Sequence, residues 1–228
     1  MSAAAWERTL RVGTADETHA LAAVLGSQLQ AGDLLVLTGE LGAGKTTFTQ
    51  GLGEGLGVRA GIISPTFVLV RIHPNLPDGP RPGGPDLVHV DAYRLGSAAE
   101  IDDIDLENTM DSAVTVVEWG RGRVEHLSES RLEVDLVRRL GGAQAPAPAQ
   151  SPEPAQSPES APGPESAPGP EAAEYAGVLD FDTDDDDEPR TIVIRGFGPR
   201  WVDPPVLPAP AESAPTTRQP LPHPPEGN

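Results

Sequence analysis

The sequence contains no cysteine, which excludes disulfide bonds, thiolate metal sites and cysteine nucleophiles. It has neither an apolar leader after a basic start nor the run of ~18 apolar residues that a membrane helix needs. Basic residues are few, with 16 Lys and Arg against 35 Asp and Glu. Because tight binding of nucleic acid needs clustered Lys and Arg, we expect none directly. These absences predict a cytoplasmic protein that does not contact membranes and reaches any nucleic acid through a partner.

Lysine is nearly absent as well. The chain has one lysine, Lys45, and all other strongly basic side chains are arginines. This lysine lies in the segment Gly39-Glu40-Leu41-Gly42-Ala43-Gly44-Lys45-Thr46, which matches the phosphate-binding loop, two glycines separated by four residues and followed by Lys and Ser/Thr. A compact ammonium fits such a loop, whereas a forked guanidinium is too large. The single lysine therefore indicates a functional position.

The context of this loop is a strand before it and a helix after it. Residues 33–38 are an apolar run typical of a buried strand, and residues 46–56 have no proline and an apolar spacing typical of a helix. Glycines let successive N–H groups point into one concavity, and the new helix adds its positive end. We predict that Lys45 reaches the outer phosphates of a nucleotide and that the Thr46 hydroxyl binds Mg²⁺. A Gly-rich turn that only caps a helix is the structural alternative.

Two apolar runs predict buried strands that end near an acid, Asp91 in one and Glu118 in the other. In open α/β sheets, ligands lie at the carboxyl ends of the strands, so either carboxylate would face the phosphates. They are rival candidates for supporting Mg²⁺ beside Thr46. The structural alternatives are that Asp91 caps the next turn and pairs with Arg94, and that either Asp91 or Glu118 is a surface acid after a strand.

Further along, Pro65 bars a helix, so we predict an extended entry into a strand that starts at Phe67. In nucleotide hydrolases a loop Thr or Ser beyond the first helix often senses the terminal phosphate, which makes Thr66 a candidate. A plain turn is the alternative.

Other periodic segments complete an α/β domain. Thr14 and Glu17 form a capping-box pattern at the start of a helix, with core positions at Leu21, Val24, Leu25 and Leu29. Ser97 begins another helical segment. Residues 131–137 and 190–196 alternate polar and apolar positions, which predicts an antiparallel hairpin.

Four motifs, in this order, resemble the TsaE (YjeE) family of bacterial P-loop ATPases, which serve the threonylcarbamoyl modification of adenosine next to the tRNA anticodon. The motifs are Gly39 to Thr47, Ser64-Pro65-Thr66-Phe67, His89-Val90-Asp91-Ala92-Tyr93-Arg94 and Val117-Glu118-Trp119. The similarity covers residues 9–140 and 190–202. The chain departs from the family in its 141–189 insertion, its longer 74–86 loop and its tail.

The resemblance implies ATP hydrolysis coupled to two partner proteins, TsaB and TsaD, with tRNA reached only through the complex. It implies ATP and Mg²⁺ as cofactors, with Thr46 and Glu118 holding the metal, Asp91 handling the attacking water and Thr66 sensing the terminal phosphate. From the residues alone, the division of labour between Asp91 and Glu118 stays open. The expected catalytic residues are Lys45, Asp91 and Glu118, and the expected nucleotide-binding residues are Gly39, Glu40, Leu41, Gly42, Ala43, Gly44, Lys45, Thr46, Thr47 and Thr66.

Composition divides the chain. Residues 141–189 hold ten of the 26 prolines, twelve acids and no basic residue, too little apolar surface to fold. We predict an α/β fold, a three-layer P-loop NTPase-like domain with a mostly parallel central sheet and an antiparallel C-terminal hairpin. Its parts are a P-loop ATPase domain over 1–140, a disordered insertion over 141–189, a strand completing the domain over 190–203, and a disordered tail over 204–228.

Other classes of function share the loop. A small-molecule kinase needs an arginine-rich lid, whereas the long inserts here hold only Arg81, and a GTPase needs a second, guanine-reading lysine. A nucleotide-binding interaction protein without significant turnover, like the kinase, stays an alternative. The site shows no obvious arginine beyond Arg94, so we expect another chain to supply the missing charge and hydrolysis to depend on partners.

Overall fold

The structure is a computed structural model that describes residues 3–138 and 188–208. The predicted insertion, apart from Glu188 and Pro189, and the tail after Pro208 lie outside these ranges. Within the described residues, no helix is long and apolar enough to span a membrane. The elements in chain order are β1 (Trp6–Val12), α1 (Ala15–Gly26), β2 (Leu34–Thr38), α2 (Lys45–Leu56), β3 (Val70–His73), β4 (Asp86–Asp91), α3 (Ala98–Asp102), α4 (Glu107–Met110), β5 (Ala113–Glu118), β6 (Arg131–Arg138), β7 (Arg190–Phe197) and the 3₁₀ turn η1 (Pro199–Trp201).

The strands form one seven-stranded sheet in the order β1-β7-β6-β2-β5-β4-β3. Its centre, from β6 through β2 and β5 to β4, is parallel. The pairs at its edges, β1 with β7, β7 with β6 and β3 with β4, are antiparallel. This topology confirms the predicted α/β class, the mostly parallel centre and the antiparallel C-terminal hairpin.

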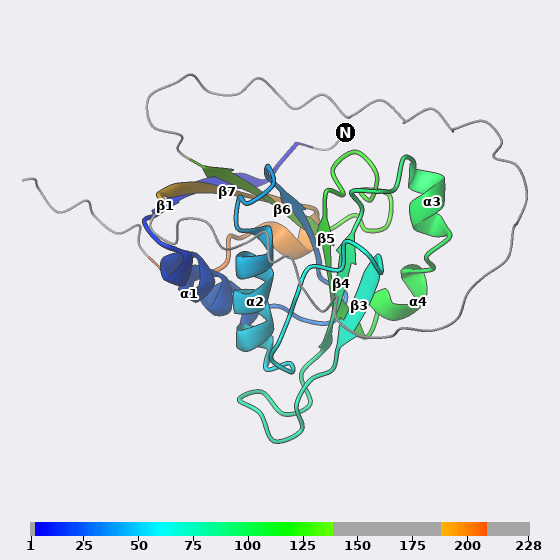
Figure 1. Ribbon diagram of the computed structural model, residues 1–228, viewed down its shortest axis with the longest axis horizontal. Coiled ribbons are helices and arrows are strands. Elements are labelled where there is room, and N and C mark those ends of the chain that lie inside the picture. The colour runs from blue at the N-terminus through cyan, green and yellow to red at the C-terminus, as the bar shows by residue number, and fades with distance from the viewer. Residues whose placement is uncertain (1–2, 139–187, 209–228) are drawn as a thin grey trace, which may run out of the picture.

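Helices cover both faces of this sheet (Figure 1), because β2 and β5 carry apolar side chains on both faces. On one face, Leu35 and Leu37 of β2 belong to a core that includes side chains of α1 and α2. On the other face, Leu34 and Val36 belong to a core with side chains from α3 and α4. The arrangement is the three-layer one that the sequence predicts.

Helix α1 begins at the predicted capping box. The Glu17 N–H donates to Thr14 Oγ1 at 3.1 Å, and Glu17 Oε2 accepts from the Gly13 N–H at 2.6 Å. Leu21 and Leu25 are buried as expected, but the assignment of Val24 to the core is wrong, since its side chain is 40% exposed. The buried stripe of α1 runs through Thr18, Leu21, Ala22 and Leu25, which leaves Val24 on its solvent side.

Helix α2 packs on α1 nearly backbone to backbone. A β-carbon built on Gly51 would lie 2.2 Å from the His19 carbonyl oxygen, and one on Gly55 would lie 2.1 Å from that of Ala23. Any larger residue at these positions would push the helices apart. The glycines of α2 therefore fix the position of its first turn, where the phosphate-binding motif lies.

The strand expected from Phe67 begins only at Val70, so that prediction is wrong at its start. The carbonyl of Pro65 accepts hydrogen bonds from the Val68 and Leu69 N–H groups at 2.9 and 2.7 Å, and Leu69 has a φ of 65°. Pro65 is thus the first residue of a tight turn instead of an extended entry, because a proline restricts its own φ and the residue before it but leaves the residues after it free to turn. The turn leaves Phe67 82% exposed.

After the hairpin, the chain packs further than the boundary expected at residue 203. Trp201 is buried, and its carbonyl accepts a hydrogen bond from Trp6 Nε1 at 2.8 Å. The Val206 backbone exchanges two hydrogen bonds with the Gln28 side chain, and Leu207 joins the core under α1. Leu207 supplies the apolar anchor that the Pro-rich composition concealed.

Candidate nucleotide-binding site

The glycine loop joins β2 to α2 in a conformation that requires glycine. Gly42 and Gly44 have φ values of 73° and 91°, in the left-handed region that other residues avoid. Gly44 is the N-cap of α2 and, having no side chain, gives the helix no side-chain cap. The positive end of the helix dipole favours an anion at this first turn.

The side chain of Lys45 is buried inside this loop. Its Nζ donates to the carbonyls of Gly39 and Glu40, both at 3.0 Å, and lies 4.2 Å from the centre of the Trp119 ring. Trp119 follows β5 and has a φ of 61°, which turns the chain out of the strand. The loop carbonyls and the indole face hold the ammonium where a phosphate chain would run.

Two carboxylates lie at the ends of neighbouring strands. Asp91 of β4 and Glu118 of β5 are register partners, and each residue is 3% exposed. Along its strand, each acid lies an even number of residues after core residues of the α2 face, Leu87 in β4 and Val116 in β5. Because side chains of a strand alternate between faces, both acids point to the side of the sheet that carries the loop. The alternative that Glu118 is a surface acid is therefore wrong.

Glu118 is held by a residue to which the sequence analysis gave no role. His89 of β4 is fully buried, and its Nε2 lies 2.8 Å from Glu118 Oε1. His89 precedes Asp91 by two residues, so both point to the same face of the strand. This two-residue spacing is the sequence signal that could have placed His89 beside the carboxylates.

Asp91 is connected to the turn that contains Thr66. Asp91 Oδ2 accepts a hydrogen bond from Thr66 Oγ1 at 2.5 Å, and Ser64 Oγ lies 2.7 Å from the same hydroxyl. Asp91 Oδ1 accepts from the Tyr93 N–H at 2.9 Å, so Asp91 does cap the next turn. The expected pairing with Arg94 is not formed, because that guanidinium lies over the Phe67 ring, 5.1 Å from its centre.

The remaining predicted residues differ in exposure. Leu41, at the tip of the loop, is 76% exposed, and Glu40 is exposed as well, so their side chains take no part in the interior of the site. Thr46 is buried in the first turn of α2, and Thr47 is partly buried beside it. In the described part of the chain, no three His, Cys, Asp or Glu side chains gather as a metal cluster.

Two arginines that the sequence analysis did not place at the site lie against the loop. A β-carbon built on Gly42 would be 3.0 Å from Arg138 Nη1, and one built on Gly44 would be 3.4 Å from Arg190 Nε. The sequence analysis found no obvious arginine beyond Arg94, and these two lie beside the loop glycines as well. Arg138 ends β6 and Arg190 begins β7 directly opposite it. The hairpin was predicted, but its place beside β2 was not, and that place brings the arginines to the loop.

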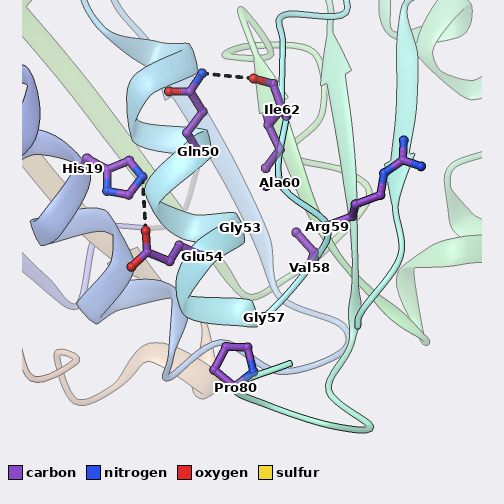
Figure 2. A pocket seen from close by; sticks show the side chains of 11 residues that line it. His19, Gln50, Gly53, Glu54, Gly57, Val58, Arg59, Ala60, Ile62 and Pro80 are labelled. Atoms are coloured by element: carbon purple, nitrogen blue, oxygen red, sulfur yellow. Dashed lines mark hydrogen bonds and ion pairs between the residues drawn. The ribbon is translucent and has the colours of Figure 1, made fainter. Parts of the chain in front are cut away.

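A separate pocket of about 350 Å³ lies at the other end of α2 (Figure 2). It is lined by α2, by the 57–62 segment and by His19 of α1, which lies 3.6 Å from Glu54. Gln50 closes one wall with a 3.0 Å hydrogen bond from Nε2 to the Ile62 carbonyl. The pocket contains none of the predicted site residues and is distinct from the loop.

The sheet order, the glycine loop between β2 and α2, and the carboxylates at the ends of β4 and β5 define a domain of the P-loop NTPase class. The chain belongs to the TsaE family: the family of threonylcarbamoyl adenosine biosynthesis protein TsaE matches residues 12–143. The fold and the match to the family confirm the resemblance seen in the four sequence motifs.

Named relatives agree. The chain is 57% identical over 118 residues to tRNA threonylcarbamoyladenosine biosynthesis protein TsaE of Streptomyces coelicolor, covering 51% of this chain and 76% of that protein. It is 38% identical over 127 residues to the protein of the same name from Bacillus subtilis, covering 55% and 74%. A crystal structure of Bacillus subtilis YdiB superposes with a TM-score of 0.52 at 25% identity, covering 88% of this chain and 92% of that one.

Proposed function

We propose that this chain binds and hydrolyses ATP as a component of the machinery that forms the threonylcarbamoyl modification on adenosine next to the tRNA anticodon, acting with TsaB and TsaD. The observation that carries the proposal is the position of Lys45, buried in a loop whose helix has no side-chain cap. Membership of the TsaE family supplies the pathway.

The residues present fit ATP and Mg²⁺. The uncapped first turn of α2 offers N–H groups to phosphate oxygens, and Lys45 adds a positive charge. Thr46 and Glu118 would hold Mg²⁺, one with a hydroxyl and the other with a carboxylate. Since Mg²⁺ commonly takes only one or two protein ligands and completes its shell with phosphates and water, a large protein cluster is not needed. The ion would neutralise charge on the outer phosphates.

The remaining groups orient the reaction. Asp91 would accept a proton from the attacking water, and Thr66, which is hydrogen-bonded to Asp91, would sense the terminal phosphate. His89 fixes the Glu118 carboxylate by its 2.8 Å contact. Lys45 leaves its loop carbonyls for the outer phosphates when they enter.

The proposal that ATP hydrolysis depends on partner proteins rests on where positive charge lies in the site. Arg138 of β6 and Arg190 of β7 lie across β2 from Asp91 and Glu118, so we do not expect them to supply positive charge at the terminal phosphate. We propose that a partner supplies it. The net charge of −19 also makes the chain a poor binder of tRNA by itself, so partners would hold the nucleic acid.

Steady-state ATPase assays test the proposal, first with the protein alone and then with TsaB, TsaD and tRNA added. We expect slow turnover alone and a marked increase in the complex, with Lys45→Ala as the inactive control. Fast turnover alone, unaffected by the additions, would contradict the coupling and favour an independent hydrolase or kinase. ATP binding without turnover under every condition would favour a nucleotide-binding interaction protein.

A further inference from the structure

Strand β1 forms one edge of the sheet (Figure 1). In the described part of the chain it pairs only with β7, and all seven of its residues are in register with that strand. The strand contains no proline, so its outer edge presents an uninterrupted row of N–H and C=O groups. Such an edge can accept a further strand through main-chain hydrogen bonds.

The exposed side chains of β1 carry charges of both signs. Glu7 and Arg11 each lie two residues from Thr9, and all three are exposed on the same face of the strand. Arg195 Nε holds Glu7 Oε2 at 2.6 Å, whereas Arg11 has no ion-pair partner among the described residues. Charges on an edge strand commonly repel other strands. Here the opposite signs make that repulsion depend on which strand arrives and in which alignment.

A second copy of β1 fits this edge in one alignment. Two identical strands related by a two-fold axis pair antiparallel, and residues of the same face lie opposite each other. Centring the pair on Thr9 places Glu7 of each copy opposite Arg11 of the other and includes every residue of the strand. Centring it on Glu7, Arg8 or Arg11 would place identical charges opposite each other. Centring it on any other residue of β1 would form no ion pair.

We propose that the β1 edge pairs antiparallel with the β1 edge of a second copy of this chain, centred on Thr9, which joins two seven-stranded sheets into one. Two cross-strand pairs of Glu7 with Arg11 stabilise this alignment against the others. The opposite edge, β3, has four residues and offers a shorter ladder. Strands β7 and β6 separate β1 from β2 and its glycine loop, so this inference is independent of the proposed function.

Sedimentation of the full chain with charge variants tests the pairing. We expect a concentration-dependent equilibrium between monomer and dimer for the wild type. Arg11→Glu and Glu7→Arg should each weaken the dimer by at least about 10-fold, because like charges then face each other twice. An equimolar mixture of the two variants should dimerise again, since opposite charges meet at both positions. Arg59→Glu, an equal charge change at an exposed residue of the remote pocket, is the matched control and should dimerise like the wild type.

The absence of cysteine permits a second, independent measurement. In the proposed alignment the two copies of Thr9 lie directly opposite each other, about 4.5–5.5 Å apart between Cα atoms, so Thr9→Cys should form a disulfide-linked dimer on mild oxidation. The two copies of Arg8 are diagonal neighbours about 7–8 Å apart. Arg8→Cys, also exposed on this edge, should therefore link more slowly and is the control for random collision.

Four results would overturn the inference. They are a wild-type chain that stays monomeric at every concentration, an unchanged dimer in Arg11→Glu, a mixture of the charge variants that stays monomeric, and equal rates of linkage in Thr9→Cys and Arg8→Cys. Circular dichroism checks that each variant folds. If Glu7→Arg does not fold beside Arg195, Arg11→Glu and the two cysteine variants decide the outcome in the same way.

Discussion

The two sides of β2 carry opposite charges toward the same loop. On the side of β5 and β4, Asp91 and Glu118 are buried carboxylates oriented by hydroxyl and imidazole groups. On the side of β6 and β7, Arg138 and Arg190 press against the glycines. The charges beside the loop are therefore divided between the two sides of β2, with carboxylates on one side and guanidinium groups on the other.

Removing the ammonium group of Lys45, which lies in the loop between the two sides, should have the largest effect. In Lys45→Ala we expect a loss of ATP turnover of at least about 100-fold together with weaker binding, because the outer phosphates lose their nearest cation. Lys45→Arg should also fail, since the pocket under Trp119 suits an ammonium. Arg59 lies at the remote pocket, so Arg59→Ala is the control and should change neither ATP turnover nor ATP binding. Normal binding and turnover in Lys45→Ala would contradict the site.

The two carboxylates are tested by substitutions that remove the charge but keep the shape of each side chain. Asp91→Asn and Glu118→Gln should each lower kcat by about 100-fold while the ATP dissociation constant changes only a few-fold. Glu107→Gln, in an exposed helix, is the control for lost negative charge. Wild-type turnover in both variants would show that the acids are structural, and a defect in one alone would identify the chemical carboxylate.

On the arginine side, the ion pair between Arg138 and Glu188 can be tested through Glu188. Glu188→Gln removes the carboxylate that neutralises Arg138, so ATP should bind a few-fold more tightly, corresponding to about 0.5–1 kcal/mol for a partly exposed pair. Titration of ATP into Glu188→Gln and into Glu7→Gln, which breaks a pair remote from the loop, checks this. Weaker binding in Glu188→Gln would mean that the pair positions Arg190 instead of competing with the phosphates.

The smallest expected effect concerns pH. His73 is buried, and desolvation together with the neighbouring His89 lowers its pKa from the usual value of 6.5. Because the unfolded chain then takes up the proton more readily, the folded state loses stability as pH falls below about 6.5. In His73→Gln, the free energy of unfolding should depend less on pH between 7.5 and 5.5, by no more than about 1 kcal/mol. Melting temperatures measured across this pH range check the prediction. Equal slopes in wild type and His73→Gln would contradict the prediction.

Local pattern accounts for much of this molecule. The loop around Lys45, the capping box at Thr14 and the strands ending at Asp91 and Glu118 were predicted because each depends on residues adjacent in sequence. Arg190 and His89 were missed because their roles depend on which strands become neighbours. The turn at Pro65 was missed because a proline before a β-branched run is compatible with both an extended segment and a turn. Leu207 lies in a segment whose composition predicts no packing.

The sheet order also has a consequence for biosynthesis. Strand β7 lies between β1 and β6, and Trp6 of β1 pairs with Gly196 of β7. During translation from the N-terminus, β1 therefore has no partner strand until residues 190–197 have left the ribosome. Contacts of such high sequence separation form slowly, since the intervening chain must first be closed into a loop. Strand β1 must therefore wait for β7, and Arg190 reaches the glycine loop only after β7 has been synthesised.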